Sequence, residues 1–452
     1  MPEAEEMYRF KAGFYADVRI EDRFNTFISF RDGRLEDCRE TRVKRAFIRV
    51  FDGEMWYYSS TSKLDEIQQE LDELYSMGRP DRGIEENAVV KRLQANRDEK
   101  LKFADNCVRD ISVEVKRELL KEVSGLFKSA YRNSLLASYL DKHVLYEFYS
   151  SKGARLRHDF QTAGIACRLG LSKGSETFDE QFSKAELSFE GLKKRMDEQE
   201  IKAFVSECEK FLLDAVPVQP GSFPVILSPL AAGVFAHESF GHKSEADFMI
   251  GDETLKREWV LGKRIGPKIL SIYDSGLIEG SGYTPYDDEG SAASKTYLIK
   301  DGVLAGRLHS ARTASELNEN VTGNARAVSA WYEPIVRMTT TVIQEGDKSV
   351  QELFGAVKRG YFIKSVRHGS GMSTFTIAPG ICYEIVDGKI GRPVKIAVAT
   401  GSVFETLGLI DGLSDKCEIH AFVTGGCGKM EQFPLSVGMG GPYVSVAAMN
   451  VQ

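Results

Sequence analysis

Two histidines and a glutamate stand together in one short segment of this 452-residue chain, which reads His237-Glu238-Ser239-Phe240-Gly241-His242. Imidazole nitrogens are common ligands of divalent metals, and a neighbouring carboxylate can serve as a general acid or base. Zinc peptidases with the motif His-Glu-x-x-His combine the same groups. We therefore interpret the segment as a metal site in which His237 and His242 are ligands and Glu238 acts on the metal-activated water.

The spacing of the two histidines is one residue longer than in that common motif. On a regular α-helix, positions i and i+4 diverge by roughly 40°, whereas i and i+5 diverge by roughly 140°. A straight helix would therefore direct His242 away from His237. Because Gly241 tolerates a local break or a π-type turn, we predict a distorted helix at residues 240–241 that brings both imidazoles to one ion.

The residues before the motif predict that its helix is buried. An apolar strand over 223–227 leads into Ser228-Pro229, a capping hydroxyl followed by proline at the first helical position. Residues 230–236 are apolar on every side of the helix. Buried polar groups cost several kcal/mol unless they are paired or bind an ion, so this setting favours a metal site over two unrelated core histidines beside an exposed glutamate.

A catalytic zinc site has three protein ligands and leaves the fourth position to water. Cys427 is one candidate for the third ligand, because glycines on both sides let its backbone approach closely. A small buried thiol is the alternative interpretation of this cysteine. Spacing alone leaves the choice open among Cys427, Cys417, Cys382, His420, His309, Glu245 and Asp247.

Several further polar residues are candidates for supporting roles. Asn324, Arg326 and Arg337 could hold the backbone or the terminal carboxylate of a peptide, because arginine makes bidentate contacts, although a surface ion pair is the simpler interpretation of each. Glu245 and Asp247 could orient a ligand imidazole through its second nitrogen, or could be surface acids near a helix end.

Composition excludes several classes of protein. A net charge of −7 argues against nucleic acid as the main partner, and no run of ~18 apolar residues predicts a membrane span. The seven cysteines are odd in number and scattered, and the first ten residues lack the apolar segment of a secretory signal. We therefore expect a cytoplasmic protein with free thiols.

The acidic triplet 287–289 could hold a cation, but a solvated turn is the commoner role of such a sequence.

The periodicity of the chain predicts an α+β fold in two domains. In the first, alternation at 16–21 and Asp-Gly pairs at 32–33 and 52–53 indicate hairpins, with further strands at 144–149 and 165–171. Helices are predicted over 63–77, around 115–126 and over 201–212. Pro217 and Pro220 then separate an N-terminal mixed strand and helix domain, 1–217, from a mostly β C-terminal domain, 218–452, which contains the buried metal-binding helix.

The second half of the chain resembles the TldD/PmbA family of metallopeptidases, also called modulators of DNA gyrase. The resemblance lies in these segments, which occur in the family's order: 233–242, 245–248, Asp287-Asp288-Glu289-Gly290, 322–326, 334–339 and Gly426-Cys427-Gly428-Lys429. The TldD-like branch keeps His-Glu-x-x-x-His and the PmbA (TldE-like) branch has lost it, so this chain resembles the catalytic branch. In the segment at 324–327 this chain has one arginine where relatives often carry two.

The resemblance implies one zinc ion per chain, with His237, His242 and Cys427 as ligands and Glu238 as catalytic acid and base. It implies a zinc-dependent endopeptidase or peptide-processing protease that works as a heterodimer with a PmbA/TldE-like subunit or as a homodimer. If the site is enclosed, only unfolded or short peptides could enter it. Two other functions are compatible with the residues. One is a non-catalytic regulatory or binding protein with a structural zinc, and the other is a hydrolase of non-peptide amides.

Overall fold

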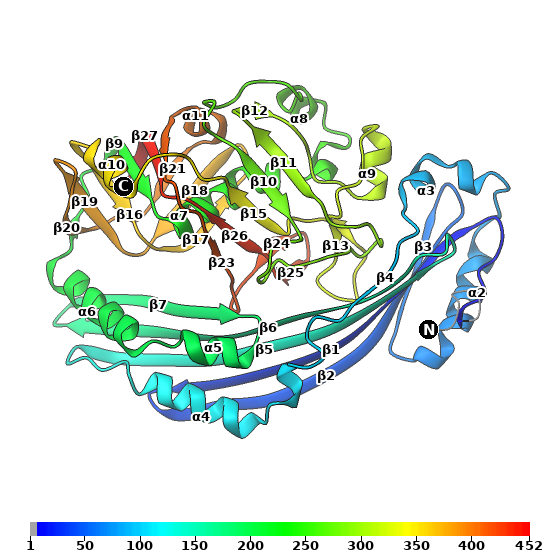
Figure 1. Ribbon diagram of the computed structural model, residues 1–452, viewed down its shortest axis with the longest axis horizontal. Coiled ribbons are helices and arrows are strands. Elements are labelled where there is room, and N and C mark those ends of the chain that lie inside the picture. Colours follow the sequence, from blue (N-terminus) through cyan, green and yellow to red (C-terminus); the bar gives the residue numbers. More distant parts are fainter. Residues whose placement is uncertain (1–6) are drawn as a thin grey trace.

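The computed structural model describes residues 7–452 (Figure 1). Its N-terminal half is built on one sheet with the strand order β3-β2-β1-β5-β6-β4, in which β7 also pairs with β6. The strands are β1 (Tyr15–Arg31), β2 (Arg34–Phe51), β3 (Trp56–Thr61), β4 (Arg97–Lys100), β5 (Arg132–Ser150), β6 (Arg155–Lys173) and β7 (Glu176–Glu186). The helices are α2 (Ile67–Met77), α3 (Ala88–Arg92), α4 (Val113–Ser124), α5 (Phe189–Arg195) and α6 (Glu198–Asp214), with 3₁₀ turns η1 (Leu64–Glu66), η2 (Ile84–Glu86) and η3 (Val108–Asp110).

Both predicted Asp-Gly hairpins are present. The turn between β1 and β2 has Asp32 at φ 49° and Gly33 at φ 81°, the left-handed geometry that a two-residue hairpin requires. Strands β5 and β6 are much longer than predicted, at 19 residues each. Residues of β6 are buried on both faces, because helices cover one side of the sheet and the C-terminal half covers the other, so the alternation that marks a half-exposed strand is lost.

The predicted helices α2, α4 and α6 are confirmed, with one correction in α4. Val115 is half exposed, and the buried side is formed by Leu119, Leu120 and Val123 together with Lys116. The Lys116 ammonium is fully buried and lies 2.8 Å from the Asp141 carboxylate of β5. Residues 79–100 contain the 3₁₀ turn η2, the short helix α3 and the strand β4, which pairs in parallel with β6.

The C-terminal half contains two larger sheets, with the orders β12-β11-β10-β15-β26-β23 and β17-β18-β21-β27-β9-β16-β19-β20-β8, β22 pairing with β27. Its strands are β8 (Val216–Pro217), β9 (Gly221–Leu227), β10 (Ile272–Ser275), β11 (Lys295–Lys300), β12 (Val303–Leu304), β13 (Ala325–Arg326), β14 (Ile335–Val336), β15 (Thr340–Ile343), β16 (Arg359–Ile363), β17 (Val366–Gly371), β18 (Thr374–Pro379), β19 (Cys382–Val386), β20 (Lys389–Lys395), β21 (Ala399–Ser402), β22 (Ile410–Leu413), β23 (Glu418–His420), β24 (Cys427–Lys429), β25 (Gln432–Leu435), β26 (Gly438–Gly441) and β27 (Val444–Val451). Its helical segments are α7 (Pro229–Phe235), η4 (Ala236–Gly241), η5 (His242–Ser244), η6 (Ala246–Met249), α8 (Glu253–Glu258), α9 (Ala311–Glu316), α10 (Val350–Gly355) and α11 (Val403–Gly408).

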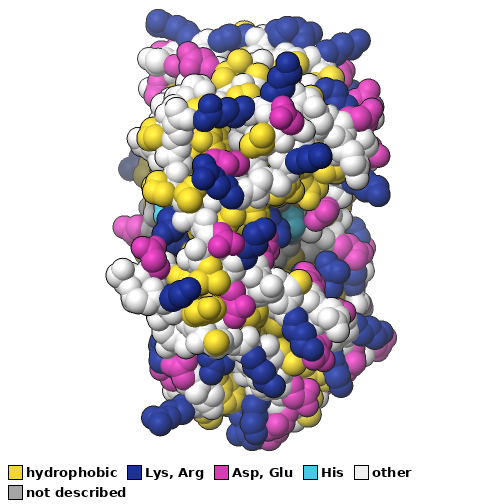
Figure 2. Space-filling view, turned by 90° about the vertical axis from the view of Figure 1, so that its left-hand side faces the viewer, with side chains coloured by type: hydrophobic (Ala, Val, Ile, Leu, Met, Phe, Trp, Pro, Cys, Tyr) yellow, Lys and Arg dark blue, Asp and Glu magenta, His cyan; other side chains and the backbone are white. Residues whose placement is uncertain are grey.

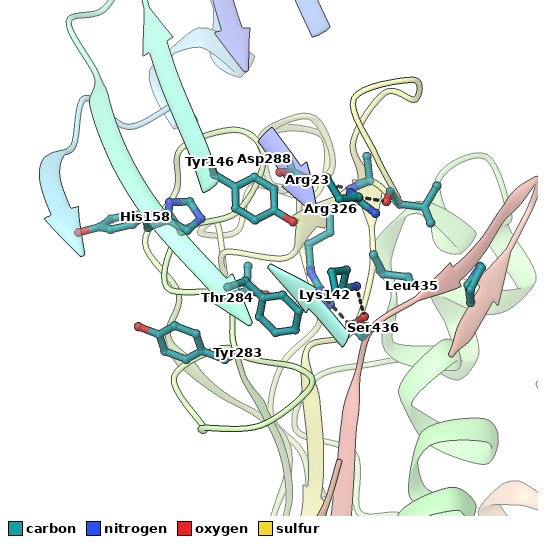
Figure 3. Close-up of a pocket in the computed structure, with 15 residues that line it drawn as sticks. Arg23, Lys142, Tyr146, His158, Tyr283, Thr284, Asp288, Arg326, Leu435 and Ser436 are labelled. Atoms are coloured by element: carbon teal, nitrogen blue, oxygen red, sulfur yellow. Dashed lines mark hydrogen bonds between the residues drawn. The ribbon is translucent and has the colours of Figure 1, made fainter. Parts of the chain in front are cut away.

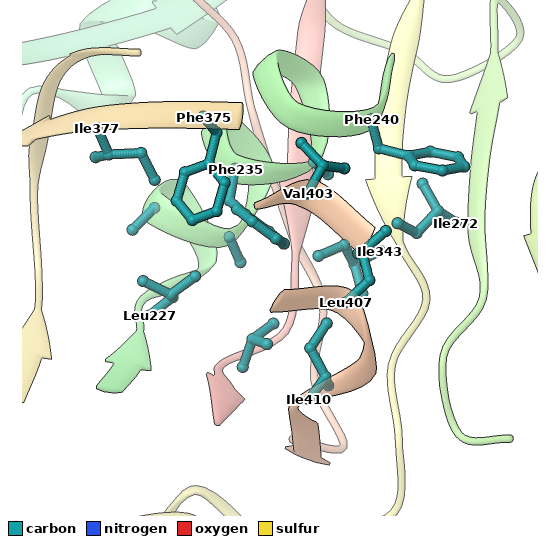
Figure 4. Packing of buried hydrophobic residues seen from close by; sticks show 14 of the residues in the cluster. Leu227, Phe235, Phe240, Ile272, Ile343, Phe375, Ile377, Val403, Leu407 and Ile410 are labelled. Carbon is teal, nitrogen blue, oxygen red and sulfur yellow. The ribbon is translucent and has the colours of Figure 1, made fainter. Parts of the chain in front are cut away.

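Helix α7 and its continuation η4 lie between these two sheets, in the main hydrophobic core of the C-terminal half (Figure 4). Phe235 packs edge-on against Phe375 of β18, with ring centroids 5.0 Å apart, and Phe240 packs against Trp259. The predicted burial of the motif helix is confirmed, and the α+β fold with a strand-rich C-terminal half is confirmed as well. Sheets on both sides hold the helix rigidly, which a precise ligand geometry requires.

The two halves of the chain share a hydrophobic core. Ile226, Leu353 and Phe362 of the C-terminal half pack in one cluster with Leu135, Ile165 and other residues of the N-terminal sheet. Strand β8 pairs with β20, so pairing into the C-terminal sheet begins at Val216. The domain division at 217/218 stays a prediction. Over residues 7–452, none of the helices has the length and apolar character needed to cross a membrane.

The C-terminal half sits on the concave side of the long N-terminal strands, while α4 and α5 lie on the opposite side of that sheet. Figure 2 shows basic and acidic side chains interspersed over one end of the molecule, with a hollow where the two halves meet. On this face, Lys and Arg side chains alternate with Asp and Glu side chains.

Candidate metal centre

The helix that carries the motif changes its winding within the motif. Helix α7 begins at Ser228, whose hydroxyl accepts a hydrogen bond from the Ala231 amide at 3.2 Å. After Phe235 the chain continues as the π-helix η4, in which the His242 amide donates to the His237 carbonyl, five residues earlier. The predicted distortion is confirmed. A π-turn needs more residues per turn than an α-helix, so positions i and i+5 face the same side.

Glycine at position 241 is required by a close contact. A Cβ atom there would lie 2.0 Å from the Met338 sulfur, so no larger residue fits without displacing Met338. The Ser239 hydroxyl donates to the Phe235 carbonyl inside the same turn. Within this π-turn the His237 and His242 rings stand edge to face, with their centroids 5.1 Å apart.

The third member of the cluster is Cys427, at the start of the hairpin β24–β25. One ligand atom from each of His237, His242 and Cys427 lies within 4.8 Å of the others, and the Cys427 sulfur is 3.5 Å from Nε2 of His242. The other candidates for the third ligand are outside this group over residues 7–452: Cys382, Cys417, His309, His420, Glu245 and Asp247.

The chemistry of these residues fits zinc. Two imidazoles and a thiolate form a mixed nitrogen and sulfur donor set, which zinc favours. His237 is 1% exposed, and its Nδ1 atom has no hydrogen-bond partner among the described residues. A buried polar atom without a partner costs free energy, and it is expected where an ion rather than a protein group completes the bonding of the site.

The cysteine is prepared to bind as a thiolate. Burial alone would raise the pKa of Cys427, but the neighbouring imidazoles of His237 and His242 outweigh burial and lower that pKa well below its usual value. A zinc ligand must be deprotonated, so this electrostatic environment reduces the cost of metal binding at neutral pH.

Glu238 lies beside the cluster and is open to solvent on one side, with 22% of its side chain exposed. Its Oε2 atom is 3.9 Å from Nε2 of His242. Burial raises the pKa of Glu238 above the usual carboxyl value, while the imidazoles of His237 and His242 oppose that shift. A carboxylate with a raised pKa is better matched to proton transfer near neutral pH.

Strand β17 passes close to Glu238. Cβ atoms built at Gly369 and Gly371 would lie 2.8 Å from Cγ and 2.7 Å from the carbonyl oxygen of Glu238, so only glycine permits this approach. In the described part of the chain β17 is the last strand of its sheet and pairs with β18 on one side only. Glu238 therefore lies against one face of an edge strand, one side of which is unpaired among the described residues.

A buried ion-pair network supports His242. Oε2 of Glu245 lies 3.1 Å from Nδ1 of His242, and the same atom is 3.1 Å from Nζ of Lys429. Glu245 is fully buried, so its interpretation as a surface acid is wrong. Asp247 contacts no ligand imidazole and instead accepts a hydrogen bond from Lys429 at 2.6 Å, which corrects its proposed role.

Lys429 is a member of this network that sequence reasoning did not single out. It is 6% exposed and also donates to the Val336 carbonyl. The spacing could have indicated that Lys429 lies near the metal centre. Lys429 follows Cys427 by two residues, and side chains at i and i+2 of a strand share a face. The charge of a lysine in a glycine-rich loop suggested solvent rather than a buried partner.

Two of the three predicted peptide contacts are corrected by the structure. Asn324 is buried and its amide donates to Asp274 and to the Arg337 carbonyl, while Arg337 is 0% exposed and donates to the carbonyls of Cys427 and Gln432. Their donors hold the protein together, and Arg337 fixes both strands of the hairpin that carries Cys427. Arg326 donates to the carbonyls of Met338 and Ser436 and lines a cavity, so its contact with a substrate stays a prediction.

The acidic triplet is not a solvated turn. Asp287 accepts hydrogen bonds from the backbone amides of Glu289 and Ser291 within its own loop, whereas Asp288 and Glu289 pair with Arg19 and Arg49 of the N-terminal sheet, both at 3.0 Å. Charges from two distant segments therefore neutralise each other in the interior. The triplet fastens the C-terminal half to the N-terminal sheet.

Comparison with known proteins finds metallopeptidases that are similar to this chain. A family model described as the PmbA/TldA metallopeptidase C-terminal domain matches residues 220–452, and one described as domain 1 matches residues 16–78. A metalloprotease of Synechocystis sp. is 32% identical over 99% of this chain and 96% of its own length. The zinc metalloprotease TldD homolog of Saccharolobus solfataricus is 26% identical, with 89% of each chain covered.

Solved structures show the same fold at lower sequence identity. TldE from Thermococcus kodakarensis is 15% identical with a TM-score of 0.74, covering 99% of this chain and 98% of that one. A Thermotoga maritima protein described as a modulator of a DNA gyrase has a TM-score of 0.75 at 17% identity, covering 97% of this chain and 96% of that one. Given the matched family models and a relative similar along nearly its whole length, the chain belongs to the PmbA/TldD family of metallopeptidases.

Proposed function

We propose that this chain is a zinc-dependent peptidase of the catalytic, TldD-like branch, with one zinc ion held by His237, His242 and Cys427. The observation that carries the proposal is that a π-turn and a distant hairpin bring these three ligand atoms within 4.8 Å of one another, beside the carboxylate of Glu238. A structural zinc site has no need of a base, so the position of Glu238 favours catalysis.

The roles of the protein groups follow from their positions. Zinc, when bound, polarises the scissile carbonyl and lowers the pKa of water. Glu238 receives the proton of the attacking water and later delivers it to the leaving amine. Glu245 orients His242 through Nδ1, and Arg337 holds the carbonyl of Cys427 at 2.7 Å so that the thiolate stays in place.

Unfolded or short peptides are the proposed substrates, and the proposed reaction is either internal cleavage or the processing of a peptide near its end. The free edge of β17 supports this, because an extended peptide can pair with it beside Glu238. We further propose a cytoplasmic location and a dimer, either with a TldE-like subunit or with a second copy. The described cysteines are all free thiols, as a reducing compartment requires.

Replacing Glu238 with glutamine tests the proposal. The zinc-loaded variant should keep about one zinc per chain while hydrolysis of an unfolded protein such as reduced casein falls by at least ~100-fold. Glu190→Gln, on the exposed first turn of α5, is a matched control with unchanged hydrolysis. A Glu238→Gln variant that still cleaves at the wild-type rate would exclude Glu238 as the base. Wild-type protein that binds zinc and cleaves neither peptides nor small amides would instead favour a regulatory protein with a structural zinc.

A further inference from the structure

A small cavity lies where the concave face of the N-terminal sheet meets the segment that follows β25 (Figure 3). Its volume is about 40 Å³, enough for a carboxylate or about three water molecules. Arg23, Lys142 and Tyr146 approach from β1 and β5, and Arg326 and Ser436 from the C-terminal half. Both halves of the molecule therefore contribute to one polar space.

Two of the cations in this cavity have no acidic partner among the described residues. Lys142 donates one hydrogen bond, to the Ser436 hydroxyl at 2.7 Å. Arg326, which is 7% exposed, donates only to backbone carbonyls, those of Met338 and Ser436. Both side chains are thus fixed on Ser436 and retain unused N–H donors. Buried cations without a counter-charge are costly unless a ligand supplies one.

The other charged groups around the cavity neutralise one another. Arg23 pairs with Glu21 at 2.9 Å, and Arg19 pairs with Asp288 at 3.0 Å and lies 3.7 Å from Glu21. The charges of these two acids and two arginines sum to zero. Lys142 and Arg326 therefore give the lining a net positive charge. The excess positive charge of the lining favours an anion over a neutral or cationic group.

Uncharged polar groups complete the lining. The Tyr146 ring directs its hydroxyl toward the space between Arg326 and Lys142 in Figure 3. His158 stacks on Tyr146 with ring centroids 5.0 Å apart, and its Nδ1 atom has no hydrogen-bond partner among the described residues. Burial lowers the pKa of His158 to about 4, so the imidazole is neutral and can accept or donate a hydrogen bond.

The cavity is close to the candidate metal centre through the hairpin β24–β25. Cys427 is the ladder partner of Leu435, and Leu435 and Ser436 line the cavity. Ladder partners are ~5 Å apart and one further residue adds ~3.4 Å, so Ser436 lies roughly 9 Å or less from the Cys427 backbone. An extended peptide covers that distance with two or three residues, since each adds about 3.4 Å.

We propose that this cavity binds the C-terminal carboxylate of the peptide substrate through Lys142 and Arg326, and so selects peptides whose free end lies a few residues beyond the cleaved bond. The inference rests on the proposed peptidase function and adds a substrate preference to it. Arginine and lysine together suit a carboxylate, because the guanidinium offers a planar pair of donors and the ammonium a compact charge.

The ionisation of Lys142 supports this assignment. Burial, together with the positive charges of Arg23 and Arg326, lowers the pKa of Lys142 to about 7. A bound carboxylate supplies the missing counter-charge and raises that pKa again. Binding at pH 7.5 is therefore accompanied by uptake of a proton, which calorimetry in buffers of different ionisation enthalpy detects.

The test compares three unstructured hexapeptides on the zinc-loaded enzyme: a free acid without acidic side chains, its C-terminal amide, and an amide with glutamate at the last position. The wild-type enzyme should have at least a tenfold lower KM for the free acid than for its amide. Lys142→Gln should reduce this ratio to about twofold or less, Lys142→Arg should restore most of it, and Lys202→Gln on the exposed face of α6 should leave it unchanged.

Binding to the zinc-loaded Glu238→Gln variant separates this inference from the proposed function. If no peptide is cleaved by the wild type, the peptidase proposal fails, while tighter binding of the free acid with proton uptake still supports the cavity. Equal binding and cleavage of acid and amide would overturn the inference and leave the peptidase intact. A glutamate-ended amide that matches the free acid would show that the cavity binds acidic side chains instead.

Discussion

The carboxylate of Glu245 joins Nδ1 of His242 to the ammonium of Lys429, at 3.1 Å from each. Since Nδ1 donates its proton to Glu245, the other ring nitrogen, Nε2, is left facing the Cys427 sulfur at 3.5 Å. Burial raises the pKa of Glu245, but the charges of Lys429, His242 and Arg337 and the hydrogen bond with His242 together outweigh burial and lower that pKa, so the carboxyl stays ionised. The orientation of His242 thus depends, through Glu245, on Lys429, which follows the ligand Cys427 by two residues.

Replacing Glu245 with glutamine is expected to weaken zinc binding by about 10–100-fold, because the imidazole loses the charged acceptor that fixes its tautomer. Competition with a chromophoric chelator measures the change. Asp252→Asn, at the exposed start of α8, is a control that removes a carboxylate outside the network. Unchanged affinity in Glu245→Gln would mean that packing alone orients His242.

Replacing Cys427 with serine is expected to lower the zinc content of the dialysed protein well below one per chain. A hydroxyl keeps its proton at neutral pH and binds zinc weakly, whereas the thiol is held as a thiolate by two imidazoles. Elemental analysis measures the metal. Cys382→Ser, a buried thiol outside the cluster, controls for loss of a cysteine. Full zinc occupancy in Cys427→Ser would show that the third ligand lies elsewhere.

The ligands were predictable because their chemistry is local. His237, Glu238 and His242 stand in one segment, and the unusual spacing itself indicated the π-turn that the structure contains. Cys427 lies 185 residues beyond His242 and could not be chosen from spacing. Its flanking glycines made it one candidate among several cysteines, histidines and acids. The family resemblance was needed to select it.

The roles of buried polar residues were the hardest to predict. Arg337, Asn324 and the triplet at 287–289 have types that suggest solvent or ligand, yet each is satisfied by a partner far away in the sequence. The same is true of Lys116 in α4, which is buried and pairs with Asp141 of β5, while the neighbouring apolar Val115 is half exposed. Whether such a polar side chain is buried depends on a hydrogen-bond partner from another element. Local periodicity does not reveal that partner.

Substituting Gly241 with alanine is expected to destabilise the protein by about 1–3 kcal/mol, because the new methyl group must displace the Met338 sulfur. Chemical denaturation measures the loss of stability, and the zinc content should fall as well because the π-turn that aligns the histidines shifts. Gly355→Ala is the matched control, since a Cβ there meets no atom within 4 Å. A Gly241→Ala variant with wild-type stability and zinc content would show that the turn adapts without cost.

The ion pair between His143 and Asp159 makes stability depend on pH at a site outside the candidate metal centre. Nε2 of His143 lies 3.6 Å from the Asp159 carboxylate. Burial opposes the charge of the imidazole, but Asp159 and the Cys107 thiol outweigh burial and raise the pKa of His143 to about 9. The folded value thus exceeds the unfolded value of ~6.5, so the stabilisation is complete below about pH 6.5 and is lost as the pH rises through about 9.

Replacing His143 with glutamine is therefore expected to lower the free energy of unfolding by about 1–2 kcal/mol at pH 6, after allowance for screening by solvent, and by much less at pH 10. Urea denaturation at the two pH values measures the difference. His368→Gln, at an exposed position in β17, should show no such dependence. If His143→Gln were equally destabilising at both pH values, the imidazole would stabilise the fold by packing alone, and its charge would contribute nothing.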